Sequence, residues 1–278
     1  MKCAWNELLA ILPPEIRPDV DKYGKDQLQE LRLRFGRPPE LVLHNGSRWL
    51  PCNVSAKDLS FVIHTASQYS PWAASTIAKG FITSDGGHRI GICGDAIVKD
   101  GEIAGIRTPT SLCIRVARDF PGIAAKAMPL SGNVLIIGPP GSGKTTLLRD
   151  LIRQISDSGQ AITVVDERQE LFPIGFDQGR RTDVLSGCSK PQGLDMALRT
   201  MGPSYIAVDE ITAETDCRAL LQCARCGVHL LATAHAENAK DLKSRPIYKP
   251  LLDANLFESI LIMRRDKTWY TERMMVCR

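Results

Sequence analysis

The chain has 278 residues, of which 44% are hydrophobic and 24% charged, and its formal net charge is +4 at pH 7. These proportions are typical of a soluble globular protein that is long enough for one large domain or two ordinary ones. The mild charge does not argue for nucleic acid or an acidic membrane surface as a partner. The sequence contains no apolar run of about 18 residues and no basic N-terminal segment followed by an apolar one, so we expect neither a membrane span nor a signal peptide.

Nine cysteines, an odd number, are scattered along the chain. In the absence of a signal peptide they indicate a reducing compartment and free thiols. Cys223 and Cys226 form a C-x-x-C pair, but no second pair stands at zinc spacing and both fall in a helical pattern. We therefore interpret them as core residues and assign no metal site to protein ligands alone.

Short helices are predicted at three places in the first 120 residues. Residues 1–30 contain amphipathic helix candidates, interrupted by Pro13-Pro14 and by Pro18. A second helical stretch begins at Ser55, because Asp58 three residues later can complete a capping box. A third helix is expected over 72–79 and ends at Gly80.

Strands with glycine turns fill the rest of this segment. Apolar and basic residues alternate over 31–35, and the run 41–44 followed by Asn45-Gly46 predicts a hairpin with a type I′ turn. Further short strands are predicted at 81–83, 88–92, 96–98, 102–104 and 112–117. The mixture indicates an α+β domain over residues 1–120.

From residue 121 onward, strands and helices alternate as they do in an α/β domain with a parallel sheet. The predicted strands cover 134–137, 161–166, 205–209 and 228–232. The predicted helices lie near 143–156, 192–201, 215–226 and 238–242. We therefore expect a second domain over residues 121–278.

The segment that follows the strand 134–137 fills every fixed position of the phosphate-binding loop G-x-x-x-x-G-K-[ST]. It consists of Gly138, Pro139, Pro140, Gly141, Ser142, Gly143, Lys144, Thr145 and Thr146. Glycines let successive backbone N–H groups turn towards a phosphate, and the following helix presents its positive end. Lys144 can reach the β- and γ-phosphates, and the Thr145 hydroxyl can bind Mg²⁺. The segment predicts a site for ATP with Mg²⁺.

A second nucleotide motif is the apolar strand that ends in Asp209 and Glu210. In P-loop NTPases an aspartate at such a strand end holds the Mg²⁺ shell, and a neighbouring glutamate can polarise the attacking water. We predict that Thr145 and Asp209 are the Mg²⁺ ligands and that Glu210 is catalytic. Glu210 favours hydrolysis over binding alone.

Other candidates are expected at the same edge of the sheet. Asp166 and Glu167 follow another predicted strand, at the edge where ligands gather in open α/β sheets. His235 ends an apolar strand and is either a γ-phosphate sensor or a structural histidine.

Arginines on or beside the strands of the first domain are also candidates. They are Arg89, Arg107, Arg115 and Arg118. They can be solvated side chains of strand faces. Alternatively, one of them supplies, from another domain or subunit, the cation for the charge that develops on a transferred phosphoryl group.

Together these motifs resemble the stage III sporulation protein AA family, which is similar to the secretion and pilus-retraction ATPases. The resemblance is carried in the first domain by 31–38, 67–70, 80–83, 86–91 and 114–118, and in the second by 135–140, 165–168, 181–185, 208–211, 233–235 and 242–246. It implies a RecA-like P-loop ATPase core behind a smaller N-terminal α+β domain.

The resemblance also implies roles for particular residues. Asp166 and Glu167 match a carboxylate-rich box, His235 matches a histidine box, and an N-terminal arginine completes the site, which here would be Arg89, Arg115 or Arg118. The chain departs from the pattern at 212–214, which read Thr-Ala-Glu where we expect a Gly-Arg pair.

The biological setting is likewise implied by the resemblance. It would be the cytoplasm of an endospore-forming bacterium, at the inner face of the mother-cell membrane. The implied assembly is a homo-oligomeric ring, for example a hexamer. Its implied role is to energise a sporulation-specific channel, or the assembly of that channel, built from membrane-embedded partner proteins.

Three other interpretations compete with this one. An ABC-type ATPase is suggested by 185–188, but Cys188 replaces a glycine and the segment between Lys144 and Ser186 is too short for the helical subdomain. A nucleic-acid-stimulated NTPase would predict a basic stripe with stacking aromatics, whereas aromatics make up 6% of the chain and no run of Lys or Arg exceeds two residues. In a non-hydrolysing nucleotide-dependent scaffold, Glu210 would be superfluous.

Overall fold

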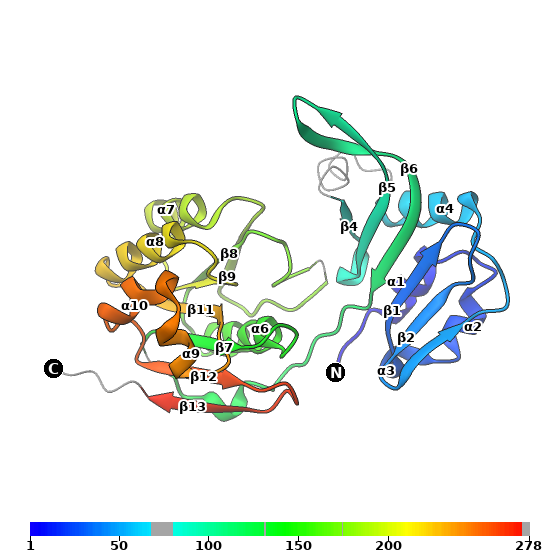
Figure 1. Cartoon of the computed structure of the whole chain (residues 1–278). Helices are drawn as coiled ribbons and strands as arrows, with labels where there is room; N and C mark the ends of the chain where they lie inside the picture. Colours follow the sequence, from blue (N-terminus) through cyan, green and yellow to red (C-terminus); the bar gives the residue numbers. More distant parts are fainter. Residues whose placement is uncertain (68–79, 131, 174, 274–278) are drawn as a thin grey trace. The chain divides into compact units, whose positions relative to one another are not determined.

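The computed structural model describes residues 1–67, 80–130, 132–173 and 175–273 (Figure 1). The chain forms two compact units. Unit 1 comprises Met1–Asp119 with Pro173–Phe176, and unit 2 comprises Phe120–Phe172 with Asp177–Arg278. The helix predicted over 72–79, and residues 68–70 of one segment that carries the family resemblance, lie outside the described residues.

Unit 1 is built on a six-stranded sheet whose neighbouring strands are all antiparallel, in the order β3-β2-β1-β6-β5-β4. The strands are β1 Leu28–Arg34, β2 Glu40–Leu43, β3 Gly46–Trp49, β4 Phe81–Thr83, β5 Arg89–Lys99 and β6 Glu102–Arg115. The helices are α1 Trp5–Ile11, α2 Arg17–Asp21, α3 Gly24–Gln27 and α4 Ala56–Ser67, and a 3-10 turn, η1, covers Asp85–Gly87.

One face of this sheet is buried and the other carries charge. Leu31 and Leu33 of β1 are fully buried in the core of the unit, whereas Arg32 and Arg34 between and beyond them are part-exposed. Helix α4 adds Leu59 to this core. The predicted capping box starts α4, since the Ser55 N–H donates to Asp58 at 2.7 Å and the Asp58 N–H donates to the Ser55 hydroxyl at 3.2 Å.

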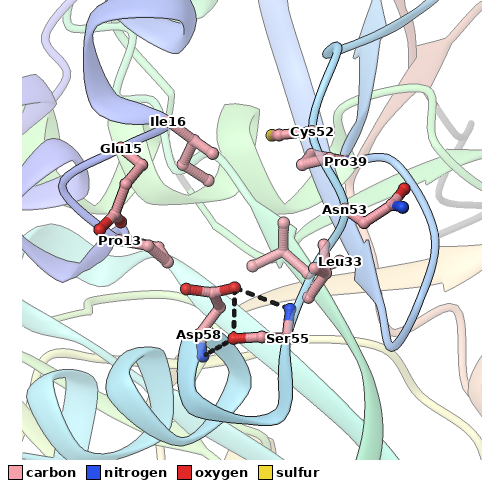
Figure 2. A pocket seen from close by; sticks show the side chains of 10 residues that line it. Pro13, Glu15, Ile16, Leu33, Pro39, Cys52, Asn53, Ser55 and Asp58 are labelled. Atoms are coloured by element: carbon pink, nitrogen blue, oxygen red, sulfur yellow. Dashed lines mark hydrogen bonds between the residues drawn. The ribbon is translucent and has the colours of Figure 1, made fainter.

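Figure 2 shows a cavity of about 290 Å³ in unit 1. Leu33 and Ile16 contribute apolar surface to it, and the capping pair Ser55 and Asp58 forms part of its wall. None of the catalytic or nucleotide-binding residues predicted from the sequence lines this cavity. It is therefore separate from the predicted chemistry.

Two local predictions for unit 1 are wrong in detail. The hairpin of β2 and β3 exists, but Leu43 pairs with Gly46, so the turn residues are His44 and Asn45. Neither has a positive φ, which a type I′ turn requires of both central residues. Pro18 does not interrupt a helix, because it stands in the first turn of α2, where its missing N–H has no helical partner to lose.

The series of short strands predicted after residue 88 is instead one long hairpin of β5 and β6 (Figure 1). Register shifts beside Gly94 let the strands continue where the sequence suggests a turn. A Cβ on Gly94 would lie 2.0 Å from the carbonyl oxygen of Thr108. This glycine therefore permits a close approach of two backbones.

Unit 2 contains a seven-stranded sheet in the order β13-β12-β7-β11-β10-β8-β9, parallel except for the pair of β12 and β13. The strands are β7 Val134–Gly138, β8 Ile162–Asp166, β9 Thr182–Ser186, β10 Tyr205–Val208, β11 His229–His235, β12 Ser259–Met263 and β13 Trp269–Arg273. The helices are α6 Lys144–Asp157, α7 Lys190–Thr200, α8 Glu214–Arg225, α9 Ala239–Ser244 and α10 Lys249–Asp253, with 3-10 turns η2 Ala125–Ala127 and η3 Pro246–Tyr248.

The α/β prediction is confirmed for unit 2, although the sequence analysis missed β9, β12 and β13. Strands β7, β8 and β10 are buried along their whole length, as the central strands of a parallel sheet are. Cys223 lies in the core, but Cys226 is exposed at the end of α8, so only the first of them is a core cysteine. In the described part of the chain, no helix has the length and apolar character to cross a membrane.

Candidate active site

The phosphate-binding loop connects the buried strand β7 to helix α6. Gly141 and Gly143 have φ values of +73° and +99°, in the left-handed region that glycine adopts without strain. Gly138 is required for space, because a Cβ there would lie 2.7 Å from the Ser142 Oγ. Helix α6 begins at Lys144, so the N–H groups of its first turn have no partner within the helix.

Two features of this loop fit a phosphate group. A Cβ on Gly141 would have no neighbouring atom within 4 Å, so the space beside the turn is open. Among the described residues, the Oγ of Ser142 is one of three buried side-chain oxygens without a hydrogen-bond partner. An unpaired buried hydroxyl beside a helix N-terminus can donate to an anion. The residues of the loop therefore suit a nucleotide phosphate.

Lys144 lies against the loop with only 7% of its surface exposed. Its Nζ donates to the carbonyl oxygens of Gly138 at 3.0 Å and Pro139 at 3.1 Å, and lies 3.1 Å from the Nδ1 of His235. Burial lowers the pKa of Lys144, while the charges of Asp209 and Glu210 work to raise it. The ammonium group thus lies between the loop, the end of β11 with His235, and the acidic residues that follow β10.

Asp209 follows β10 directly and is held at both carboxylate oxygens. The Thr145 hydroxyl donates to Oδ2 at 2.7 Å, and the Thr233 hydroxyl donates to Oδ1 at 2.5 Å. A threonine hydroxyl and a carboxylate are hard oxygen ligands of the kind that Mg²⁺ binds next to substrate phosphates. Thr145 and Asp209 therefore fit a Mg²⁺ site.

Glu210 stands where the chain leaves the sheet, and its φ is +57°. A left-handed conformation costs a non-glycine residue about 1–2 kcal/mol, so the surrounding contacts must hold it. Its carboxylate accepts hydrogen bonds from His235 Nε2 and from Arg168 Nη1. Burial tends to raise the pKa of Glu210, but the hydrogen bond from His235 and the charges of Arg168 and Lys144 outweigh it, so the pKa is lowered.

His235 connects Lys144 to Glu210. Because the lysine ammonium can only donate, Nδ1 of His235 accepts from it, and Nε2 carries the proton that is donated to Glu210. The ring ends strand β11, next to Gly138 of β7 in the sheet register. This position links the lysine of the loop to the carboxylate beyond β10.

Asp166 and Glu167 make their contacts elsewhere. The buried carboxylate of Asp166 accepts backbone N–H groups of the loop that follows, from Glu170 at 3.0 Å and Leu171 at 2.9 Å. Burial raises the pKa of Asp166, and those N–H groups oppose the rise. Glu167 lies 2.5 Å from the buried Nζ of Lys190. The residue of this carboxylate-rich segment that contacts Glu210 is Arg168.

The candidate arginines all belong to unit 1 and have different surroundings. Arg118 donates to the carbonyl oxygens of Lys25, at 3.0 and 2.8 Å, and of Leu28, and burial lowers its pKa. Arg115 is 67% exposed and lies 3.5 Å from Glu30. Arg89 pairs with Arg115 in the register of the sheet and stacks over the Phe81 ring at 4.0 Å.

Sequence reasoning missed two residues that contact the predicted site. Arg168 and Thr233 lie inside segments that carry the family resemblance, but neither received a role of its own. Thr233 is fully buried and contacts both Asp209 and the backbone of Glu210. A polar β-branched residue inside an apolar strand, two positions before a strand-end histidine, was the available signal.

Comparisons with known proteins identify the family of this chain. The family model "Sporulation stage III, protein AA" matches residues 5–273. Stage III sporulation protein AA of Bacillus subtilis (strain 168) is 36% identical over 282 aligned positions, which cover 94% of this chain and 92% of that protein. The chain belongs to the stage III sporulation protein AA family.

Solved structures of secretion and pilus ATPases have the same fold as this chain. The ATPase DotB of Yersinia pseudotuberculosis has a TM-score of 0.62 at 16% identity, over 94% of this chain and 79% of that one. The pilus retraction motor PilT with bound ADP also has a TM-score of 0.62, at 17% identity, over 89% and 76% of the two chains. The predicted RecA-like P-loop NTPase fold is thereby confirmed.

Proposed function

We propose that this chain is a Mg²⁺-dependent ATPase of the secretion-ATPase type. The observation that carries the proposal is the meeting of Lys144, Asp209 and Glu210 with Thr145 and His235 at one edge of the unit 2 sheet. A loop suited to phosphate, two oxygen ligands suited to Mg²⁺ and an ionised carboxylate are the parts that phosphoryl transfer to water needs.

Each residue has a part in this mechanism. Lys144 binds the β- and γ-phosphates, and Thr145 and Asp209 hold Mg²⁺, which when bound neutralises phosphate charge. Glu210 accepts a proton from the attacking water, for which its lowered pKa keeps it ionised at neutral pH. His235, bonded to both Lys144 and Glu210, is placed to respond to the γ-phosphate.

Glu210 must free one oxygen before it can bind water. Arg168 is the partner that can leave, because its side chain is 57% exposed and an exposed ion pair contributes little. In this proposal Asp166 supports the loop that carries Arg168, and Glu167 ties the start of that loop to Lys190 of α7. We further propose that Arg89 or Arg115 of unit 1 completes the site of another copy in a homo-oligomeric ring.

Family membership supports a role in endospore formation. The proposed role is to energise a sporulation-specific membrane channel, or its assembly, from the cytoplasmic face of the mother-cell membrane. Membrane-embedded channel proteins would be the partners.

The proposal is tested by nucleotide binding and steady-state ATP hydrolysis with and without Mg²⁺. Lys144→Ala should weaken ATP binding on the order of a hundredfold and abolish hydrolysis, because the buried cation is lost. Lys240→Ala, which removes an exposed lysine of α9, is the matched control and should behave like the wild type. Equal ATP binding by Lys144→Ala and wild type would refute the site.

A further inference from the structure

Thr233 stands one strand away from the two acidic residues and contacts the backbone or side chain of three successive residues. Its hydroxyl donates to Asp209 Oδ1 at 2.5 Å and accepts from the Glu210 N–H at 2.7 Å. Its backbone oxygen accepts the Ile211 N–H at 2.9 Å. One threonine therefore fixes the whole turn that follows β10.

The strand register alone does not hold Asp209 and Glu210. The parallel register between β10 and β11 ends at the pair Val208 and Ala232. Beyond it the backbone turns away at Glu210, whose positive φ removes it from the strand direction. The Thr233 hydroxyl accepts the Glu210 N–H, which the strand register leaves without a partner at this part-buried position.

The hydroxyl of Thr233 makes both of these contacts at once. A threonine hydroxyl has one donor, which goes to Asp209, and it accepts from Glu210. The β-branched side chain has few allowed rotamers in a strand, so the hydroxyl direction is set before any ligand binds. Thr233 has no exposed surface and does not bond to Lys144 or Thr145.

We infer that Thr233 is a positioning residue of the site: it aims the Asp209 carboxylate at the Mg²⁺ position and holds Glu210 in its left-handed turn. The inference rests on the proposed function for its consequence in hydrolysis. Asp209 and Glu210 then act as one unit, because one hydroxyl contacts both. Removing that hydroxyl should disturb the metal site and the water-activating site together.

The chain offers a matched control. Thr163 is also a buried threonine in a parallel strand of the same sheet, on β8, with 2% of its surface exposed. In the described part of the chain its Oγ1 has no hydrogen-bond partner. Thr163→Val therefore removes a buried hydroxyl that positions nothing, whereas Thr233→Val removes one that positions two residues.

The experiment measures two quantities on the full chain: steady-state ATP hydrolysis, and ATP affinity in Mg²⁺ compared with affinity in chelator. Thr233→Val should lower hydrolysis about 10- to 100-fold and lose most of the gain in affinity that Mg²⁺ gives. Affinity in chelator should stay within about twofold of wild type, because Lys144 and the loop are untouched. Thr163→Val should match wild type in both quantities.

Two more variants separate positioning from packing. Thr233→Ser keeps the hydroxyl and should restore most of the hydrolysis and of the Mg²⁺ response. In an Asp209→Asn background, Thr233→Val should add little further loss of Mg²⁺ response, because the two residues act in one chain of contacts. If Thr233→Val keeps the wild-type Mg²⁺ response, or if Thr163→Val loses as much of it, the inference is wrong.

This design separates the inference from the proposed function. A wild-type chain that hydrolyses no ATP refutes the ATPase proposal, while the Mg²⁺ dependence of binding still decides the role of Thr233. A wild-type chain that hydrolyses ATP, with Thr233→Val equally active and equally responsive to Mg²⁺, refutes only the positioning role.

Discussion

Two charged regions of the molecule are organised in opposite ways. At the site edge of unit 2, the charged groups are connected to one another: His235 contacts both Lys144 and Glu210. On the outer face of the unit 1 sheet, each arginine is satisfied locally, as Arg34 is by Glu40 at 2.7 Å and Arg115 is by Glu30 at 3.5 Å.

The two regions differ in how exposed their side chains are and in what the loss of one side chain does to its partners. The residues at the site edge are part-buried and positioned by strand ends, so the loss of one group leaves others unpaired in a low dielectric. The arginines of unit 1 are 42% to 67% exposed where they form ion pairs, so such pairs contribute little to stability. An arginine of that face that matters for hydrolysis must therefore act on something outside unit 1.

The sharpest test of this contrast is alanine substitution at Arg89 and Arg115. We expect one of them to lower ATP hydrolysis about a thousandfold while the free energy of unfolding changes by less than about 0.5 kcal/mol. Wild-type specific activity should also rise with protein concentration, because the proposed arginine would come from another copy. Arg34→Ala, on the same face but not a candidate, is the control. Activity that is independent of concentration and unchanged in both variants would contradict the role in trans.

In contrast to these arginines, Lys190 in unit 2 is expected to contribute strongly to stability. Its side chain is 4% exposed and lies 2.5 Å from Glu167 and 3.8 Å from Asp216. Lys190→Ala leaves these carboxylates without their cation and should lower the free energy of unfolding by about 3 kcal/mol in urea titration. Arg199→Ala removes an exposed ion pair of the same helix and should cost less than about 0.5 kcal/mol.

Arg118 is the exception within unit 1, since it donates to backbone carbonyls and is part-buried. Arg118→Ala should lower the free energy of unfolding by about 2 kcal/mol, because charged donors to two carbonyls are lost. The exposed Arg107 of β6 provides the control, for which little change is expected. A stable Arg118→Ala protein with lost hydrolysis would instead make Arg118 the arginine that completes the site.

A smaller, pH-dependent change in the free energy of unfolding is expected from His88, which is fully buried in unit 1. Its Nε2 donates to the Ala4 carbonyl oxygen at 2.8 Å and its Nδ1 accepts the Ala117 N–H at 3.1 Å, so the folded state needs the neutral ring. Burial lowers the pKa of His88 below 6.5. The unfolded chain therefore binds the proton more readily, and stability is complete above pH 6.5 and declines as the pH falls below it.

The free energy of unfolding should decline by about 1 kcal/mol between pH 7 and pH 5.5, since a single proton contributes at most about 1.4 kcal/mol per pH unit. Urea unfolding of wild type and His88→Gln at both values measures it. The variant should be less stable at pH 7 and show a shallower fall. An equally steep fall in His88→Gln would assign the pH dependence to other groups.

The sequence predicts most of unit 2 because its signals are local. The buried strand β7, the loop and Asp209 with Glu210 each have their own pattern, and parallel strand ends must meet at one edge. It misses β9 and β13 because edge strands bury little and alternate weakly, and it misses β12 because a short apolar run such as residues 260–263 is ambiguous by itself.

What the sequence could not predict depends on contacts between distant residues. Asp166 is predicted as a site carboxylate from its place at a strand end, but the sequence does not reveal that its oxygens accept N–H groups of the next loop. Thr233 gives only a weak signal, a polar residue in an apolar strand, and its contacts with both Asp209 and Glu210 appear only in the structure. Gly94 resembles a turn residue, but the strands pass close to each other there.

The most direct test of the account is Glu210→Gln, measured for both ATP binding and ATP hydrolysis, with Glu214→Gln as a control on the exposed start of α8. We expect binding within about twofold of wild type and hydrolysis lowered at least about a hundredfold, because the amide cannot accept the proton of the attacking water. Glu214→Gln should retain both. Unchanged hydrolysis by Glu210→Gln would contradict the assignment of Glu210 as the residue that activates water.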